Sequence, residues 1–492
     1  MEDKGSLKWW ILLTVIVGTF LGRLDQTIVN LALPDIINDF GISVSAAGWI
    51  ATAYILANAI FVPIWGKLGD TIGRKKVYIL GFAIFIVGSV LAGLAWNLTS
   101  MIIFRVIQAI AGSADYPTAM AILAVTFKEG KERAQALGIW SSSFAAAAVF
   151  GPLLGGPLID HFGWRSVFLI NLPLGILGIF MALQFIRESV ADRGTKFFDW
   201  WGAITLGISL SALVLVLDKA TDWGWFSVGS LLCYMTMLVF LWIFVKIEQR
   251  VPEPIVDLKF FKIPAFVNAL GNNFLIFVGM MGSIFLLPIF AQTFLGYNAT
   301  QAGYLFIPMA GALMLAAPIG GALTGKVESR YVIFASTLVA SIGIYLYSFI
   351  DPKSTALSLM IPLAIMAFGM GFGMAQRTNI IASVVDKNEI GIASSILALV
   401  RNVAGAFGIA VFGTILNSTI KNNILHITSL STIHTSSPQV LGEYRALIAL
   451  KAQVSAYGHV FFIAALLVFV GAFLTLLLKV DNEKTDVVVH VE

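Results

Sequence analysis

The sequence predicts an all-α integral membrane protein with fourteen membrane-spanning helices. Of its 492 residues, 58% are hydrophobic and only 12% are charged, whereas soluble domains carry about 25% charged residues. The apolar residues also gather in runs of about 20, the length that crosses a bilayer as a helix. This composition excludes a soluble enzyme, a disordered protein and a nucleic-acid-binding protein.

The fourteen apolar runs extend almost from one end of the chain to the other. Proline and glycine inside them do not exclude spans, because neighbouring helices can satisfy the freed backbone groups. The first run is too long for the apolar core of a signal peptide, so we expect it to stay as the first helix. In chain order, the runs cover residues 9–33, 46–65, 77–96, 100–124, 135–158, 164–186, 198–218, 226–247, 265–294, 301–324, 331–350, 356–379, 391–416 and 456–479.

The positions of Lys and Arg between the runs predict the orientation. Most of the 31 Lys and Arg residues fall on one side of the membrane if the chain starts inside, and cytoplasmic loops are the ones that concentrate these residues. In this assignment Arg377 belongs to the inner connection that follows the run 356–379. We therefore expect both termini in the cytoplasm of a protein that spans the plasma membrane many times.

The longest connection, 417–455, falls on the outer side. It is polar and rich in Ser and Thr, so we expect a solvated loop or a short surface helix there. The charged residues 480–492 form a cytoplasmic tail. A single cysteine, Cys233, excludes an intramolecular disulfide.

The sharpest local motif lies between the second and third runs, where residues 66–76 read GKLGDTIGRKK. Gly66 and Gly73 allow tight turns, Asp70 can accept hydrogen bonds from a helix N-terminus, and Arg74 can clamp a carboxylate. The stretch resembles the signature of the major facilitator superfamily in the same loop. In that family the loop is a cytoplasmic gate, so the resemblance implies gating roles for Gly66, Asp70, Gly73 and Arg74.

Four further segments resemble the same superfamily. The run 101–117, with Arg105 and Gln108, is similar to the motif of its fourth span, and residues 151–157, GPLLGGP, to the fifth-span motif of its antiporters. Residues 24–34 and 164–175 are similar to the fourteen-span drug:proton antiporter branch. Small residues let helices approach closely and prolines bend them, which gives a packing role to five residues of the antiporter motif: Gly151, Pro152, Gly155, Gly156 and Pro157.

The resemblance implies the major facilitator fold, with two six-helix halves and two extra central helices. The expected parts are an N-terminal half at 9–186, the inserted pair at 187–263, a C-terminal half at 264–479 and the tail 480–492. Residues 321–330 are a degraded copy of the gate loop without its Asp. That copy is a weak sign of an internal repeat.

Ionisable residues inside spans are costly and usually face a cavity or a partner. Five occur here: Arg23, Asp25, Arg105, Asp115 and Arg401. Asp25 and Asp115 are candidates for proton coupling, because a carboxylate that alternates between apolar and basic surroundings takes up and loses a proton. A structural role stays open for each, and Arg23 serves either the transport chemistry or the neutralisation of Asp25.

The depths of the two acids lead us to favour Asp25. It is about sixteen residues into its span, about 24 Å along the helix and in the outer half, whereas Asp115 lies about 22 Å down a helix that enters from outside. We expect Asp25 to be the principal proton or cation site, with Asp115 and Arg105 as its inner partners. Arg105 is alternatively a structural clamp.

Polar and aromatic residues within the runs are candidates for lining a substrate cavity, since rings bind lipophilic cations and amides offer adaptable hydrogen bonds. Packing is the alternative for each ring. The candidates are Tyr54, Asn58, Tyr116, Trp140, Asn273, Gln292, Gln376 and Arg401. No P-loop and no H-E-x-x-H sequence occurs, and the five His residues form no cluster, so we expect no ATP-driven pump, no metal site and no cofactor other than the coupling proton.

These observations predict a transporter rather than an enzyme, acting as a monomer on a small-molecule substrate. The expected activity is proton-coupled export of small amphipathic or cationic compounds, as in multidrug efflux. An exporter of a specific lipid-like or endogenous metabolite would have the same fold. A non-transporting sensor or scaffold is the alternative of another class, although a scaffold has little reason to carry buried charges.

Overall fold

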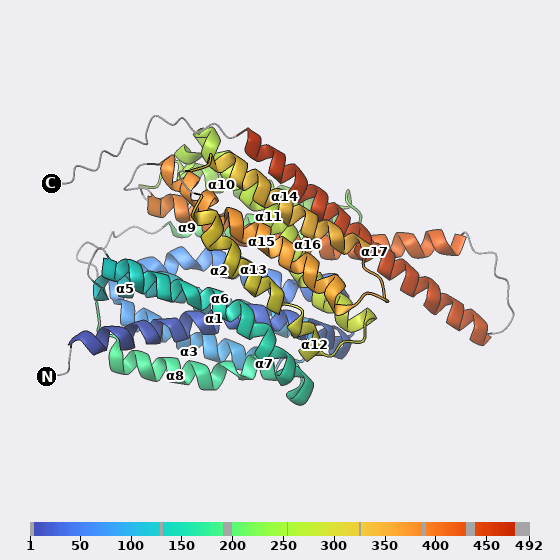
Figure 1. Ribbon diagram of the computed structural model, residues 1–492, viewed down its shortest axis with the longest axis horizontal. Coiled ribbons are helices and arrows are strands. Elements are labelled where there is room, and N and C mark those ends of the chain that lie inside the picture. The colour runs from blue at the N-terminus through green and yellow to red at the C-terminus, as the bar shows by residue number, and fades with distance from the viewer. Residues whose placement is uncertain are drawn as a thin grey trace.

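The computed structural model describes residues 4–127, 131–189, 199–252, 254–323, 326–385, 390–429 and 438–477. Within these ranges the regular structure is entirely helical, and the long helices lie side by side in one bundle (Figure 1). Helix α1 begins and α17 ends at one end of this bundle, which we call the terminal end; the opposite end is the far end.

The first helices follow the predicted runs, with two of the runs divided. The run 100–124 is split into α4 and α5, and the run 164–186 into α7 and α8. The helices are α1 (Lys4–Phe40), α2 (Val44–Ile72), α3 (Arg74–Gly93), α4 (Leu98–Gly112), α5 (Asp115–Thr126), α6 (Lys131–Phe162), α7 (Ser166–Leu169), α8 (Asn171–Phe185), α9 (Trp200–Trp223) and α10 (Val228–Glu248).

The remaining helices also follow the predicted runs, and the run 301–324 is divided into α12 and α13. The helices are the 3-10 turn η1 (Leu258–Lys262), α11 (Pro264–Phe294), α12 (Ala299–Tyr304), α13 (Ile307–Gly321), α14 (Ser329–Leu346), the 3-10 turn η2 (Tyr347–Phe349), α15 (Ala356–Ser383), α16 (Ile390–Ser429) and α17 (Pro438–Leu476). In the part of the chain described, 13 segments are long and apolar enough to cross a membrane, and α6 occupies the remaining predicted span at 135–158.

Helices that start at the far end carry polar caps. Ser43 accepts a hydrogen bond from the backbone of Ala46 at the start of α2. Asn97 and Asn298 form capping boxes before α4 and α12. Such caps satisfy backbone N–H groups that the first turn leaves free, so the polar residues between the apolar runs fix where these helices begin.

The helices form two groups with α9 and α10 beside them (Figure 1). In the first group α1 packs on α6, and α3 on α4; in the second, α13 packs on α15, and α11 on α16. The groups meet where α2 packs on α16, α6 on α12, and α1 on α11. The largest apolar cluster joins both groups and includes Ile28, Leu33, Phe285 and Phe290.

The predicted outer loop at 417–455 is wrong in extent. Helix α16 continues to Ser429 and α17 already begins at Pro438, and both extend beyond the bundle at the far end (Figure 1). Only 430–437 of the predicted loop lies outside the described residues. The polar character of these residues marks a helix in water, since hydropathy measures apolar content and not helicity.

Candidate functional site

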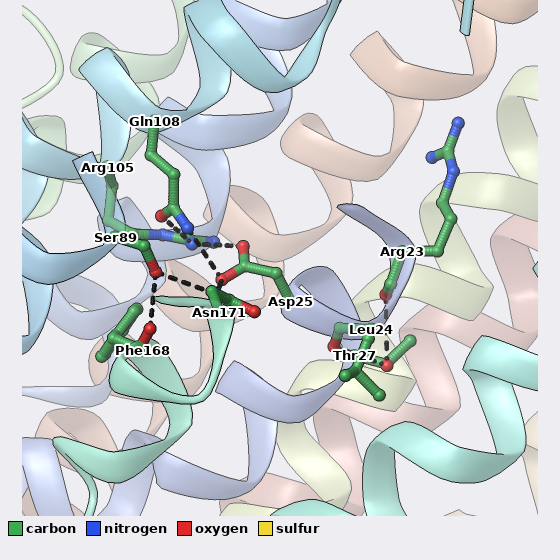
Figure 2. A network of polar contacts seen from close by, with 9 residues as sticks. All are labelled: Arg23, Leu24, Asp25, Thr27, Ser89, Arg105, Gln108, Phe168 and Asn171. Atoms are coloured by element: carbon green, nitrogen blue, oxygen red, sulfur yellow. Dashed lines mark hydrogen bonds and ion pairs between the residues drawn. The ribbon is translucent and has the colours of Figure 1, made fainter. Parts of the chain in front are cut away.

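A buried ion pair joins α1 to α4. Nη1 of Arg105 lies 2.6 Å from Oδ2 of Asp25, and both side chains are buried. The same nitrogen donates to Gln108 at 2.7 Å. Gln108 and Asn171 in turn donate to the other carboxylate oxygen, each over 2.9 Å. Figure 2 shows the four side chains converging from α1, α4 and α8.

A second layer of contacts fixes the orientation of this network. Asn171 also donates to Ser89 of α3, and Ser89 donates to the backbone carbonyl of Phe168, both over 2.8 Å. The guanidinium carbon of Arg105 lies 4.1 Å from the ring centroid of Tyr54, a cation–π distance. Both oxygens of Asp25 therefore have donors, and the network ties α1 to α2, α3, α4 and α8.

Arg23 does not neutralise Asp25. Its side chain points away from the network (Figure 2) and donates to Gln26 over 3.1 Å. It lies close enough to Asp115 to attract that carboxylate. The structure gives the neutralising position beside Asp25 to Arg105.

Asp115 belongs to a separate cluster. Its Oδ2 accepts a hydrogen bond of 2.8 Å from Thr19, which accepts one of 2.9 Å from the indole of Trp140. Its Oδ1 is buried without a hydrogen-bond partner in the described part of the chain. A cavity of about 10 Å³ beside it is lined by Gly18, Gly22, Tyr78 and Gly112, among others, and has room for about one water molecule.

Of the two partners predicted for Asp25, the structure brings Arg105 into contact with it but not Asp115. Arg105 touches Asp25, while Asp115 contacts α1 through Thr19, about 9 Å along the helix from Asp25. The α-helix expected between Arg105 and Asp115 is interrupted by a turn at Ser113 and Ala114, within a single span from Leu98 to Thr126.

A third buried cluster surrounds Arg377, which the sequence analysis assigned wrongly to a loop. Arg377 lies inside α15 and is 2% exposed. Its Nε donates to Asn272 over 2.8 Å, and its Nη2 donates to Ser336 over 2.9 Å and Thr337 over 2.8 Å. Its Nη1 donates to the carbonyl of Met370 over 3.3 Å. All of these partners are uncharged.

Arg401 of α16 lies near this cluster. Its Nε donates to Asn273 over 3.2 Å, and its guanidinium lies 5.4 Å from the ring centroid of Phe277. Tyr116 of α5 is close enough to interact with it electrostatically. Tyr116 also packs on Trp140, with ring centroids 5.4 Å apart.

The other cavity candidates have different positions. Tyr54 is buried under Arg105, and Asn58 is half-buried on α2. Gln292 donates to the carbonyl of Leu31 over 3.0 Å, a bond from α11 to α1. Gln376 is buried and donates to the carbonyl of Gly320 over 3.1 Å, so it braces the second group internally.

An apolar groove lies elsewhere, between α2 and α9. It has a volume of about 740 Å³ and an apolar lining that includes Trp49, Phe61, Trp200, Ile204 and Gly207. None of the predicted cavity residues lines it.

The predicted gate loop is a sharp helix junction at the terminal end. Gly73 has φ of +114°, which strongly favours glycine. Arg74 donates to the carbonyl of Ala121 over 3.5 Å. A Cβ on Gly66 would lie 3.3 Å from Pro117, so α2 and α5 pack closely here. Asp70 lies in α2, and its side chain is outside the described set.

Glu188 contacts the predicted gate loop, and the sequence analysis did not select it. It follows α8 and accepts hydrogen bonds from the backbone N–H groups of Lys75 over 3.1 Å and Lys76 over 3.3 Å. A carboxylate at a helix N-terminus is stabilising. Glu188 thereby clasps the start of α3 to the end of α8, a contact between residues 113 positions apart that local spacing does not reveal.

The antiporter motif lies in α6 at a close crossing with α1 and α12. A Cβ on Gly151 would lie 2.8 Å from the Cβ atom of Thr27, and one on Gly155 would lie 3.2 Å from the Cδ1 atom of Ile28, with other atoms of both side chains closer still. A Cβ on Gly156 would lie 2.8 Å from the backbone nitrogen of Thr300. Pro152 and Pro157 both lie within the helix, and the carbonyl of Pro152 approaches Gly303.

At the same crossing, a carboxylate of the first group of helices caps the N-terminus of a helix of the second group. Asp160 of α6 accepts hydrogen bonds of 3.0 Å from the backbone N–H groups of Ala299 and Thr300 at the start of α12. With the Gln292–Leu31 bond, these contacts link the two groups towards the far end.

Comparison with known proteins agrees with this architecture. The family described as the Major Facilitator Superfamily matches residues 15–409. The chain is 34% identical over 423 residues to the multidrug transporter protein MdtP of Bacillus subtilis, covering 85% of this chain and 77% of MdtP. It is 29% identical over 482 residues to the riboflavin transporter RibZ of Clostridioides difficile, covering 97% and 99%.

A solved structure shares the fold. It is a bacterial homologue of the human lysosomal transporter Spinster, inward-facing and unoccupied, which superposes with a TM-score of 0.70 at 19% identity. The match covers 97% of this chain and 99% of that one. The chain belongs to the major facilitator superfamily, a family of transporters rather than enzymes, in the fourteen-span branch that its motifs predicted.

Proposed function

We propose that the protein exports small amphipathic compounds across the cytoplasmic membrane in exchange for protons. Two six-helix halves, 9–186 and 264–479, rock around a central site by alternating access. Both termini face the cytoplasm, so the terminal end is the inner end and the α16–α17 extension projects outside. The multidrug relative MdtP supports this function class.

The buried Asp25–Arg105 pair is the observation that carries the proposal. A charged pair taken out of water stabilises a protein only when its geometry is good, so a protein that needed only a rigid bundle would do as well with apolar residues. A proton that binds Asp25 removes the negative charge and weakens the hold of α1 on α4. Loss of the proton restores the pair, which couples one proton to the movement of two helices.

The glycine contacts at the two ends support a two-state movement. At the terminal end Gly73, Arg74 and Glu188 join α2, α3 and α8, which fits the predicted gating role of the loop and of Asp70. At the far end the motif in α6 lets α12 pack closely. Closing one end while the other opens requires such contacts to separate without breaking a helix.

The relatives differ in the substrates that their names give. MdtP is named for multidrug transport and RibZ for riboflavin, so relatives of one fold differ in what they carry. An exporter of one endogenous or lipid-like metabolite therefore stays as the second candidate, supported by the 99% coverage of RibZ. The membrane-buried ion pair argues against a non-transporting scaffold.

Purified protein reconstituted in liposomes provides the test. An imposed pH gradient should drive accumulation of a fluorescent amphipathic dye, and collapsing the gradient should stop it. Asp25→Asn should abolish gradient-driven movement while downhill movement continues, because an amide does not exchange a proton. Asp39→Asn is the matched control, since Asp39 lies on the same helix in an exposed pair with Arg165.

Two results would overturn the proposal. One is dye movement that ignores the gradient, and the other is unchanged proton release on dye binding in both Asp25→Asn and Asp115→Asn. Proton release lost only in Asp115→Asn would transfer the coupling role to α5.

The proposed topology has a test of its own. A cysteine placed at Gly442 in a Cys233→Ser background should react with an impermeant thiol reagent in intact cells.

A further inference from the structure

The second group of helices holds buried positive charge with no acid to balance it. No Asp or Glu occurs in the sequence of α11 to α16, while Arg377 and Arg401 lie within α15 and α16. In the first group, by contrast, Arg105 is paired with Asp25. Ionisable groups at membrane depth usually pair or face a water-filled path, so the two unbalanced arginines need an explanation.

Arg377 is explained by its hydrogen bonds. Its three nitrogens donate to Asn272, Ser336, Thr337 and the carbonyl of Met370. These neutral oxygens hold the guanidinium in place but do not cancel its charge. The Arg377 cluster therefore braces α11, α14 and α15, and it adds a fixed positive potential close to Arg401, near enough for the two arginines to repel each other.

Arg401 is not explained in this way. In the described part of the chain only its Nε has a hydrogen-bond partner, Asn273, and no carboxylate lies within ion-pair distance. Its side chain is half-buried, so the two Nη groups keep hydrogen-bond donors available to a ligand. Two parallel N–H groups are the geometry that binds a carboxylate or phosphate through both oxygens.

The surroundings of Arg401 suit a ligand that is also aromatic or apolar. Phe277 lies against the guanidinium. Tyr116, on the other group of helices, lies within electrostatic range of the guanidinium. The Tyr116 side chain is 41% exposed and packs on Trp140. The Arg401 guanidinium thus has an aromatic ring against it, and a second aromatic pair, Tyr116 and Trp140, lies within electrostatic range on the other group of helices.

We propose that Arg401 binds an anionic group of the exported compound, so that the preferred substrates are amphipathic anions, aromatic or aliphatic carboxylates above all. This proposal rests on the proposed export function and narrows its substrate class. A cationic head group in the same position would meet the charges of both Arg401 and Arg377. The anion instead supplies the counter-charge that the second group of helices lacks.

Three probes with one ring system provide the test. They are pyrene carrying a butyrate, a butyramide or a butylammonium chain, and their binding to the purified full-length protein is followed by fluorescence anisotropy. We expect the butyrate to bind at least about tenfold more tightly than the butyramide, the ratio that one good charged contact supports. Arg401→Gln should remove this difference and leave the butyramide affinity unchanged.

Further variants separate charge from fold. Arg401→Lys should keep part of the preference, because it retains the charge without the fork. Arg401→Glu should invert the preference towards the butylammonium probe. Arg445→Gln is the control, since Arg445 is an exposed arginine on the α17 extension, and it should match the wild type. The unchanged butyramide affinity shows in each case that the variant is folded.

The outcomes distinguish the two proposals. Equal affinity for butyrate and butyramide in the wild type, or a preference that survives Arg401→Gln, overturns the anion site, and so does a failure of the butyrate probe to bind. Export of the neutral probe under a pH gradient would then still support the transport function. Conversely, a charge-dependent affinity without gradient-driven movement would keep the anion site and overturn proton-coupled export.

Discussion

Arg105 and Asp25 form a 2.6 Å ion pair that is closed to solvent and links α4 to α1. The corresponding arginine of the second group, Arg377 in the fourth span after the insertion, meets Asn272 of the first such span. One pair carries a carboxylate and the other an amide. A proton can therefore change the charge balance of the first cluster, whereas the second cluster stays positive.

The ion pair predicts a non-additive effect on stability. Arg105→Gln leaves the Asp25 carboxylate buried without a counter-charge, and breaking one side of such a pair costs about 3–5 kcal/mol in soluble proteins. Adding Asp25→Asn removes that charge, so the double variant should melt at a higher temperature than Arg105→Gln alone. Thermal unfolding in detergent measures this order. Additive losses would show that the two residues do not depend on each other.

The Arg377 cluster predicts a structural role without a role in substrate binding. Arg377→Lys keeps the charge but loses the fork that reaches Asn272, Ser336 and Thr337, so the melting temperature should fall, by the loss of bonds worth about 1.5–3 kcal/mol each. Probe affinity, measured well below the melting temperature, should be unchanged. Thr378→Ser, an exposed neighbour on α15, is the control. A weakened affinity at full stability would place Arg377 in the substrate site instead.

The sequence predicted the spans because membrane thickness requires long apolar runs. It misplaced Arg377, since an arginine two residues from the end of an apolar run resembles a loop residue, and only Ser336, Thr337 and Asn272 from other helices show that it is buried. It also overestimated the outer loop, because the polar residues up to Ser429 form a helix that hydropathy does not detect.

The sequence predicted several residues of the candidate site but not the contacts between them. Charge inside apolar runs selected Asp25 and Arg105, yet their contact joins residues 80 positions apart, and spacing along the chain says nothing about such pairs. Asp115 was grouped with them because an unbroken helix was assumed, and the break after Gly112 removes that assumption. Asn171 was noted only as part of the segment 164–175, and Glu188 was not selected, since the contacts that give them their positions join residues more than 100 positions apart.

Glu188 predicts a gating effect at the terminal end. Glu188→Gln weakens the bonds to the backbone of Lys75 and Lys76, so α3 and the end of α8 should separate more easily. We expect a change in transport rate, with probe affinity in the purified protein unchanged, because Glu188 is exposed and at the end of the bundle. Glu443→Gln on the α17 extension is the control. An equal loss in both variants would indicate a non-specific charge effect.

Gly156 tests the closure of the far end most directly. A methyl group there would lie 2.8 Å from the backbone nitrogen of Thr300 and 2.9 Å from the carbonyl of Ala299, and backbone atoms cannot rotate away as a side chain does. Gly156→Ala should therefore force α12 off α6, weaken the Asp160 bonds to α12 and favour the state that is open at this end.

The measurement is the distance between spin labels at Phe162 and Gln301, which flank this crossing, in a Cys233→Ser background. The distribution should shift to longer distances in Gly156→Ala, and gradient-driven export should fall about tenfold or more, because one of the two states is disfavoured by at least about 1.4 kcal/mol. Gly311→Ala is the matched control, since a Cβ there meets nothing within 4 Å, and it should keep both the distances and the rate. An unchanged distance in Gly156→Ala would show that the two halves do not need this crossing to close.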